Sequence, residues 1–356
     1  MTENHCLWSG SPRDSVASRS TLWAVRPELR RRIERFSAKV EQSSAKNAKR
    51  TEHARHARHA KRNVLNLWSG GLYILRSSFS PAEKEFGGNT DSRARSRVDP
   101  TEERKNFEER GYLVLPALLP PPLLARLVPE VDRWMDEGLR DRSIACSTGP
   151  EAGARPPVLE LELPAHGELL AHPPLMAVLA DVMGGAFAHH HLHSQRQGAG
   201  DSGKPWHHDH EPNDLGDRSL PMVHALHYLG GLDEAVGSLA VLPGSHREDV
   251  PKDFRAALGT TALPGEVVID RLPPGSTVLI NSAVFHARRP ALSPVAGRNR
   301  YFVDASYCRT GARWRPVKPY WQYMLARARE LDLDRGQWPE LFDARHFTEF
   351  PGAGGR

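Results

Sequence analysis

The stretch Pro205-Trp206-His207-His208-Asp209-His210 decides how the rest of this 356-residue chain is interpreted. In an extended strand, successive side chains point to opposite faces, so His207 and Asp209 project to the same side, about 7 Å apart along the strand. An imidazole and a carboxylate at that spacing can bind one metal ion, whereas His208 points to the other face. We therefore expect a strand that carries two ligands of a metal site.

Two ligands leave a divalent ion undercoordinated, and His286, which follows the apolar stretch 275–285, is the expected third ligand. Two histidines and one carboxylate leave three positions open for a bidentate cosubstrate and O2, as non-haem Fe(II) oxygenases require. Three alternatives stay open. The register can shift to use His208 or His210, His246 in a Pro-Gly turn competes with His286, or the triplet is a solvent-facing loop.

Several segments, in the same order, resemble the phytanoyl-CoA dioxygenase (PhyH) family of Fe(II)/2-oxoglutarate oxygenases. They are Phe107–Pro116 (FEERGYLVLP), Trp206–Asp209 (WHHD), Gly237–Arg247 (GSLAVLPGSHR), the strand that runs into His286, and Gly297–Val303 (GRNRYFV). The resemblance implies a mostly β fold with flanking helices, a double-stranded β-helix (a cupin-like jelly roll) with iron in its open mouth. It also implies His207, Asp209 and His286 as iron ligands, and Fe(2+), 2-oxoglutarate and O2 as cofactor and cosubstrates.

A 2-oxoglutarate cosubstrate needs a cation for its distal carboxylate, and a guanidinium suits it because it makes two parallel charge-assisted hydrogen bonds. Arg298 and Arg300 follow His286 by 12 and 14 residues and are expected on one strand face. The resemblance favours Arg298, and Arg300 stays an alternative. Gln195 and Lys204, upstream of the iron strand, are expected to help orient the cosubstrate.

Two positions refine the expected chemistry. Related halogenases replace the carboxylate ligand by Ala or Gly, so Asp209 favours a hydroxylase or another oxidising member of the family. The sequence departs from its relatives at Arg288, two residues after His286, where they often carry a small or hydroxylic residue. The resemblance therefore does not determine the detailed contacts of the distal carboxylate.

Local patterns are consistent with this fold. Helices are expected from Thr101 to Gly111, from Pro120 onward, and over 169–183 and 323–331. Short apolar segments bounded by turn residues predict strands, which are 112–115, 186–195, 222–229, 238–242, 266–270, 277–281 and 301–306. Successive short strands predict a sandwich or barrel and not alternating βαβ units.

Other histidines have two interpretations. His189, His191 and His193 are expected on one face of a strand, either as a substrate-lining surface or as ordinary hydrogen-bonded side chains. His224 and His227 lie on opposite faces of another strand, so at most one of them faces the pocket.

Charge divides the chain at about residue 100. Residues 1–100 hold 20 Lys/Arg against 10 Asp/Glu, net +10, and the rest hold 28 against 33, net −5. We expect a basic, low-complexity extension over 1–100, disordered or helical, and the oxygenase domain over 101–350. Three widely spaced cysteines form no disulfide or zinc pattern, which indicates a cytoplasmic setting, and no apolar run is long enough to span a membrane.

The sequence predicts an Fe(II)/2-oxoglutarate-dependent dioxygenase that hydroxylates or otherwise oxidises a small organic molecule, while 2-oxoglutarate is decarboxylated to succinate and CO2. One alternative is a non-catalytic jelly-roll protein that binds a metal or ligand. Another is a nucleic-acid-directed oxygenase anchored by the basic segment, which the net −5 of the catalytic part disfavours. The sequence determines neither the substrate nor the oligomeric state.

Overall fold

The computed structural model describes residues 101–148, 153–198, 200–248 and 258–350, and the extension expected over 1–100 lies outside them. Helix α2 (Glu102–Arg110) begins at Thr101, whose side chain accepts a hydrogen bond from the Arg104 N–H, and ends at Gly111 in the left-handed conformation. Both expected boundaries are confirmed, since the cap satisfies an orphan N–H and glycine adopts positive φ without a penalty.

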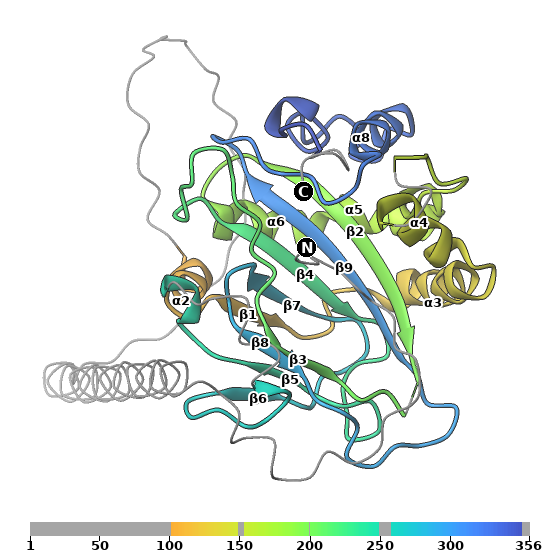
Figure 1. Ribbon diagram of the computed structural model, residues 1–356, viewed down its shortest axis with the longest axis vertical. Coiled ribbons are helices and arrows are strands. Elements are labelled where there is room, and N and C mark those ends of the chain that lie inside the picture. Colours follow the sequence, from red (N-terminus) through yellow and green to blue (C-terminus); the bar gives the residue numbers. More distant parts are fainter. Residues whose placement is uncertain (1–100, 149–152, 199, 249–257, 351–356) are drawn as a thin grey trace, which may run out of the picture.

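Two antiparallel sheets face each other (Figure 1). The larger sheet has the order β1 (Tyr112–Leu115), β7 (Ser276–Asn281), β4 (Met222–Tyr228), β9 (Arg300–Arg309) and β2 (Phe187–Gln197). The smaller sheet has the order β3 (Lys204–His207), β8 (His286–Arg288), β5 (Leu239–Val241) and β6 (Val267–Ile269). From β2 to β9 the chain crosses between the two sheets at every step except the one from β5 to β6, so the expected jelly roll is confirmed.

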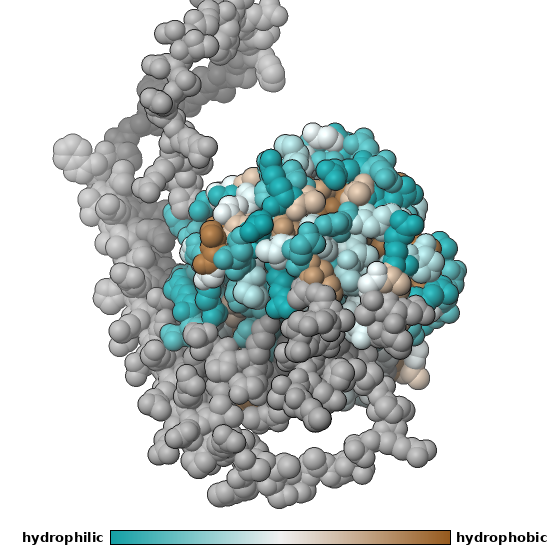
Figure 2. All heavy atoms as spheres, turned by 45° about the horizontal axis from the view of Figure 1, so that its top comes forward, coloured by the Kyte–Doolittle hydropathy of each residue, from teal (hydrophilic) through white to brown (hydrophobic). Residues whose placement is uncertain are grey.

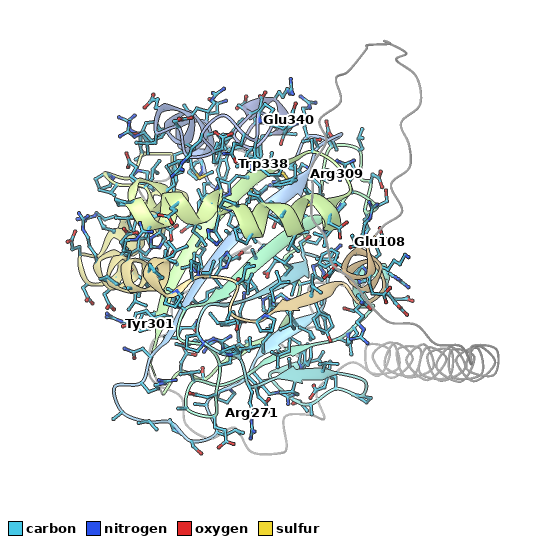
Figure 3. All side chains as sticks on the ribbon, turned by 180° about the vertical axis from the view of Figure 1, so that it is seen from behind. Glu108, Arg271, Tyr301, Arg309, Trp338 and Glu340 are labelled. Carbon is cyan, nitrogen blue, oxygen red and sulfur yellow. The ribbon has the colours of Figure 1, made fainter. Side chains whose placement is uncertain are left out.

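Helices cover the outer face of the larger sheet (Figure 3). They are α3 (Pro121–Asp136), α4 (Leu139–Thr148), α5 (Pro164–Leu170), α6 (Pro173–Met183) and α8 (Trp321–Glu330). Leu127 and Leu179 of the helices are fully buried in one cluster with Ala225 and Ala305 of the sheet. Burying each large apolar side chain contributes about 1.5–3 kcal/mol, so the helices fix the sheet from outside and leave its inner face free for a site.

Three short 3-10 helices complete the described elements: η2 (Glu160–Glu162), η3 (Ser245–Arg247) and η5 (Ala344–His346). The single helix expected over 169–183 is wrong, because α5 ends at Leu170 and α6 begins at Pro173. Proline disfavours helical backbone in the residue before it, which separates the two helices. Helix α4 was not predicted, and its apolar spacing is too irregular to show an amphipathic face.

A bulge in β2 also changes one expectation. The register of β2 against β9 shifts between His189 and His191. His189 therefore does not share a face with His191, and its ring packs against Tyr307 and Phe342 instead. A bulge inserts one residue and so reverses the alternation that the sequence pattern assumes.

No helix in the part of the chain that the structure describes is long and apolar enough to cross a membrane. On the face of the molecule that Figure 2 shows, hydrophilic side chains predominate and hydrophobic ones occur in small separate groups. Most large apolar side chains are buried inside the sandwich or between the sheet and its helices.

The turn that begins β7 gives a first prediction. Gly275 has φ +78°, and a Cβ there would lie 2.5 Å from the backbone O of Leu119. Gly138 has φ +65° but nothing within 4 Å of such a Cβ. We expect Gly138→Ala to lower the free energy of unfolding by about 1–2 kcal/mol, because a residue with a Cβ is strained in the left-handed backbone conformation. Gly275→Ala should cost at least about 1 kcal/mol more, because it also displaces backbone. Urea unfolding of both variants measures this, and equal losses would contradict it.

Candidate active site

Strands β3 and β8 bring three predicted side chains together. His207, the last residue of β3, pairs with His286, the first of β8, and Asp209 lies just beyond the end of β3. The Nε2 atoms of His207 and His286 are 3.6 and 3.3 Å from Asp209 Oδ2. One ligand atom from each of the three residues lies within 4.8 Å of the others. The backbone N–H of Asp209 donates to the Ser282 carbonyl at 2.8 Å, which fixes the carboxylate beside the histidines.

The backbone orients both histidines for metal binding. His207 Nδ1 is 2.7 Å from the carbonyl of Pro205, and His286 Nδ1 is 3.0 Å from that of Val284. A carbonyl only accepts, so each Nδ1 carries the hydrogen and each Nε2 presents its lone pair. His207 Nε2 is buried and has no hydrogen-bond partner among the described residues. Two imidazole nitrogens and a carboxylate oxygen in this arrangement fit an Fe(II) ion.

The electrostatics of the site favour the forms that bind a metal. Burial, Lys204 and His286 lower the pKa of His207 to about 3, so the imidazole is neutral. Burial alone would raise the pKa of Asp209, but Lys204 and His207 outweigh it and hold that pKa well below its usual value. A neutral imidazole and an ionised carboxylate are the states in which these groups bind metal ions.

The rival histidines lie in other contacts. His208 Nδ1 accepts from the backbone N–H of His210, and His210 Nδ1 is 3.3 Å from Ser282 Oγ. His246 Nε2 lies 3.2 Å from the carbonyl of Glu108. Neither His208, His210 nor His246 belongs to a metal-ligand group found among the described residues.

The Pro-Gly turn positions His286 instead of supplying a ligand. Ser245 Oγ accepts a hydrogen bond from the N–H of Phe285 at 2.8 Å, and the Leu242 N–H donates to the Phe285 carbonyl at 2.9 Å. These bonds fix the residue directly before His286. The turn therefore determines where β8 begins.

The structure distinguishes the two arginines. Arg300 is the first residue of β9, its side chain is 3% exposed, and its guanidinium lies over the Tyr228 ring, 4.9 Å from the centroid. Its Nε and Nη1 have no hydrogen-bond partner among the described residues. Arg298 precedes the strand, is 47% exposed and pairs with Asp233 at 2.6 Å. The expectation that both arginines share a strand face is wrong, because β9 begins at Arg300, two residues later than that expectation requires. Its burial makes Arg300 the better candidate for binding the cosubstrate carboxylate.

The two other predicted cosubstrate residues lie on strands of both sheets. Lys204 Nζ is 3.8 Å from Asp209 Oδ1, next to the three clustered side chains. Gln195 is buried, and its Oε1 accepts from Gln197 Nε2 at 2.7 Å. Gln197 pairs across the sheet with Arg300. Gln195 is two residues from Gln197 in β2, so its side chain projects to the same face as Arg300.

A second polar group on the larger sheet was not identified from the sequence as a unit. His191, His224 and Asp304 offer ligand atoms within 4.8 Å of one another. His224 Nδ1 is 3.0 Å from Asp304 Oδ2 and 2.8 Å from Ser306 Oγ, while His227 bonds Thr277 on the other face. Burial opposes a charged His224, but Asp304 outweighs it and raises the pKa of His224. The alternation of side chains along a strand predicts the face of each residue separately. Only the pairing of β2 and β4 with β9 brings His191, His224 and Asp304 together.

Comparison with known proteins gives one family and several similar solved structures. The profile of the family described as phytanoyl-CoA dioxygenase (PhyH) matches residues 107–298, more than half of the chain. No curated protein matches. The non-haem α-ketoglutarate-dependent epimerase SnoN of nogalamycin biosynthesis is 18% identical, with a TM-score of 0.46 over 60% of this chain and 84% of that one. Iron-bound HygX from Streptomyces hygroscopicus is 22% identical, with a TM-score of 0.44 over 60% and 88%.

The His224 and Asp304 pair predicts a pH-dependent stability. Because the folded pKa of His224 is raised, the pair's contribution is complete below about pH 6.5, the ordinary value, and is lost as pH rises through the folded pKa. In metal-free protein, Asp304→Asn should cost about 1.5–3 kcal/mol at pH 6 and less at pH 9. Asp233→Asn, which breaks the exposed pair with Arg298, should cost at most about 1 kcal/mol at both. A loss for Asp304→Asn that does not change with pH would refute this.

Proposed function

We propose, because this chain belongs to the phytanoyl-CoA dioxygenase family, that it is an Fe(II)- and 2-oxoglutarate-dependent dioxygenase that hydroxylates or otherwise oxidises a small organic molecule. The family membership accounts for the iron and 2-oxoglutarate dependence. The observation that supports activity in this particular chain is the intact set of two histidines and one carboxylate, with both Nε2 atoms turned to Asp209.

His207, Asp209 and His286 would hold the iron. When bound, Fe(II) supplies the oxygen activation that is coupled to decarboxylation of 2-oxoglutarate. The chain's own residues orient this chemistry. Pro205 and Val284 set the tautomers of the two histidines through their carbonyls, and Lys204 keeps the Asp209 carboxylate ionised. A binding protein without catalysis would not need a ligand set with three open positions.

Arg300 is the proposed anchor of the distal carboxylate of 2-oxoglutarate, in place of Arg298. A buried guanidinium with unused donors is matched by a planar carboxylate that accepts two parallel hydrogen bonds. Gln195 and Lys204 are proposed to orient the cosubstrate from the adjoining strands, on the iron side of that anchor.

The inner face of the larger sheet supports a polar substrate. His191 and Asp304 are partly exposed there beside the buried His224, so they offer hydrogen-bonding groups to a molecule in the barrel. The charges of Asp209 and Lys204 also act on His224, with Asp209 raising its pKa and Lys204 lowering it. Ser306 bonds both His191 and Asp304, and the exposed parts of these two side chains can make further hydrogen bonds to a polar substrate.

Metal binding tests the ligand assignment. His286→Ala should reduce bound iron from about one per chain to a small fraction, since two ligands hold a divalent ion poorly. His246→Ala should keep the iron, because its ring contacts the carbonyl of Glu108 and lies outside the ligand group. Iron per chain, counted after desalting, decides this. Full retention in His286→Ala would falsify the assigned triad.

Cosubstrate affinity tests the anchor. Leaving a buried carboxylate without its arginine costs about 2–5 kcal/mol, a factor of about 30 to several thousand. Arg300→Gln should therefore raise the dissociation constant for 2-oxoglutarate by at least about 30-fold while iron stays bound. Arg298→Gln should change it by less than about 2-fold, because that side chain is half exposed. Anaerobic titration of the Fe(II) protein, following its charge-transfer absorption band, measures both, and the reverse ranking would return the anchor to Arg298.

A further inference from the structure

Arg288 lies inside the barrel on the iron side of the smaller sheet. It follows His286 by two residues in β8, so the two side chains project to the same face. Between them, Ala287 belongs to the apolar cluster on the opposite face of the sheet. The Arg288 side chain is only 11% exposed, and its partner across the strands is Lys204. A third cation thus joins Lys204 and Arg300 around the proposed cosubstrate site.

Asp201 supplies a counter-ion for Arg288 from the segment before the iron strand. Its Oδ1 is 2.5 Å from Arg288 Nη2 and also accepts a hydrogen bond from the N–H of Gly203 at 3.0 Å. Gly203 has φ +91°, and a Cβ there would lie 2.4 Å from the backbone O of Arg288. Glycine therefore lets this segment approach β8 closely enough for Asp201 to reach the arginine.

The charges at this end of the barrel do not balance. Burial lowers the pKa of Arg300 most, Tyr228 opposes that shift, Arg288 lowers the pKa further, and Asp201 opposes it. Arg288 pairs across β8 and β5 with Leu239, which lies in one interior cluster with Tyr228, the ring under the Arg300 guanidinium. The two guanidinium groups and the Asp201 carboxylate therefore lie at one end of the barrel, and their charges sum to one positive charge. A buried charge without a partner costs several kcal/mol, so this end of the site favours one more anion.

We propose that Arg288 binds the distal carboxylate of 2-oxoglutarate together with Arg300, and that the negative charge of Asp201, which also binds Arg288, weakens this binding. This inference rests on the proposed function. A guanidinium has five N–H donors in a fixed plane, so Arg288 can contact Asp201 and a ligand carboxylate at once. Asp201 would then weaken cosubstrate binding by repelling a second carboxylate nearby, and the affinity would be set by the difference between the two effects.

The experiment compares three single variants of the full chain by anaerobic titration of the Fe(II) protein with 2-oxoglutarate. Arg288→Gln should raise the dissociation constant by about 10-fold or more, because one cation is lost from the carboxylate. Asp201→Asn should lower it by about 3-fold or more, because the repelling negative charge is lost while the side-chain shape is kept. Arg289→Gln is the matched control. Arg289 is the next residue and pairs with Glu266 at 2.6 Å, so its change should stay within about 2-fold.

A second probe locates the effect on the cosubstrate. 2-Oxovalerate has the same chain length but lacks the distal carboxylate, so its affinity should change by less than about 2-fold in Asp201→Asn and Arg288→Gln. Melting temperatures of the metal-free variants show whether each has folded. If Arg288→Gln does not fold, Arg288→Lys replaces it, and it should retain part of the affinity because it keeps the charge but loses the planar fork.

Opposite signs for Asp201→Asn and Arg288→Gln support the inference. Weaker binding in both, or no change in Arg288→Gln, would show that the pair only holds the segment before β3 in place and would overturn it. Equal changes with 2-oxovalerate would also overturn it. Failure of the proposed function is a different result, in which the wild-type protein binds iron but gives no absorption band with 2-oxoglutarate.

Discussion

The antiparallel pairing of β3 with β8 is the contact on which the site depends. It sets His207 opposite His286, although 78 residues separate them in the sequence. Behind the pair, Trp206 and Phe285 stack with ring centroids 5.5 Å apart, and the Trp206 Nε1–H donates to the Thr261 carbonyl. A slip of one residue would move His207 to the outer face and Trp206 into the barrel. Packing of the aromatic pair therefore enforces the register that the proposed metal ligands need.

The described helices pack on only one face of the larger sheet, so its other face is available to form the site. The helices bury alternate residues of β4 and β9, such as Ala225 and Ala305, in the outer core. The residues between them face the smaller sheet. There Leu226 and Tyr228 pack in the interior apolar cluster, and His224 hydrogen-bonds Ser306. The same alternation therefore supplies a stable scaffold on one face and chemistry on the other.

Electrostatics divides the interior into two parts. Around Asp209, the proposed ligands are an ionised carboxylate, the neutral imidazole of His207 and the imidazole of His286, a set suited to a divalent cation. Around Arg300, two arginines exceed one carboxylate, which suits an anion. A dicarboxylic cosubstrate that chelates a metal at one end and presents a carboxylate at the other matches both parts. The pairing of Lys204 with Arg288 across β3 and β8 links them.

By itself, the sequence determined the caps of α2 and the proximity of His207 to Asp209, because these follow from turn chemistry and local spacing. His286 was expected as the third member of the group from the family resemblance. The structure places those three side chains together. Only the tertiary structure distinguishes the buried Arg300 from the half-exposed Arg298, since burial depends on where β9 begins and on the Tyr228 ring across the sheet. It also decided the bulge after His189 and the contact of Asp201 with Arg288, because strand register and the approach of distant segments are set by packing over the whole fold.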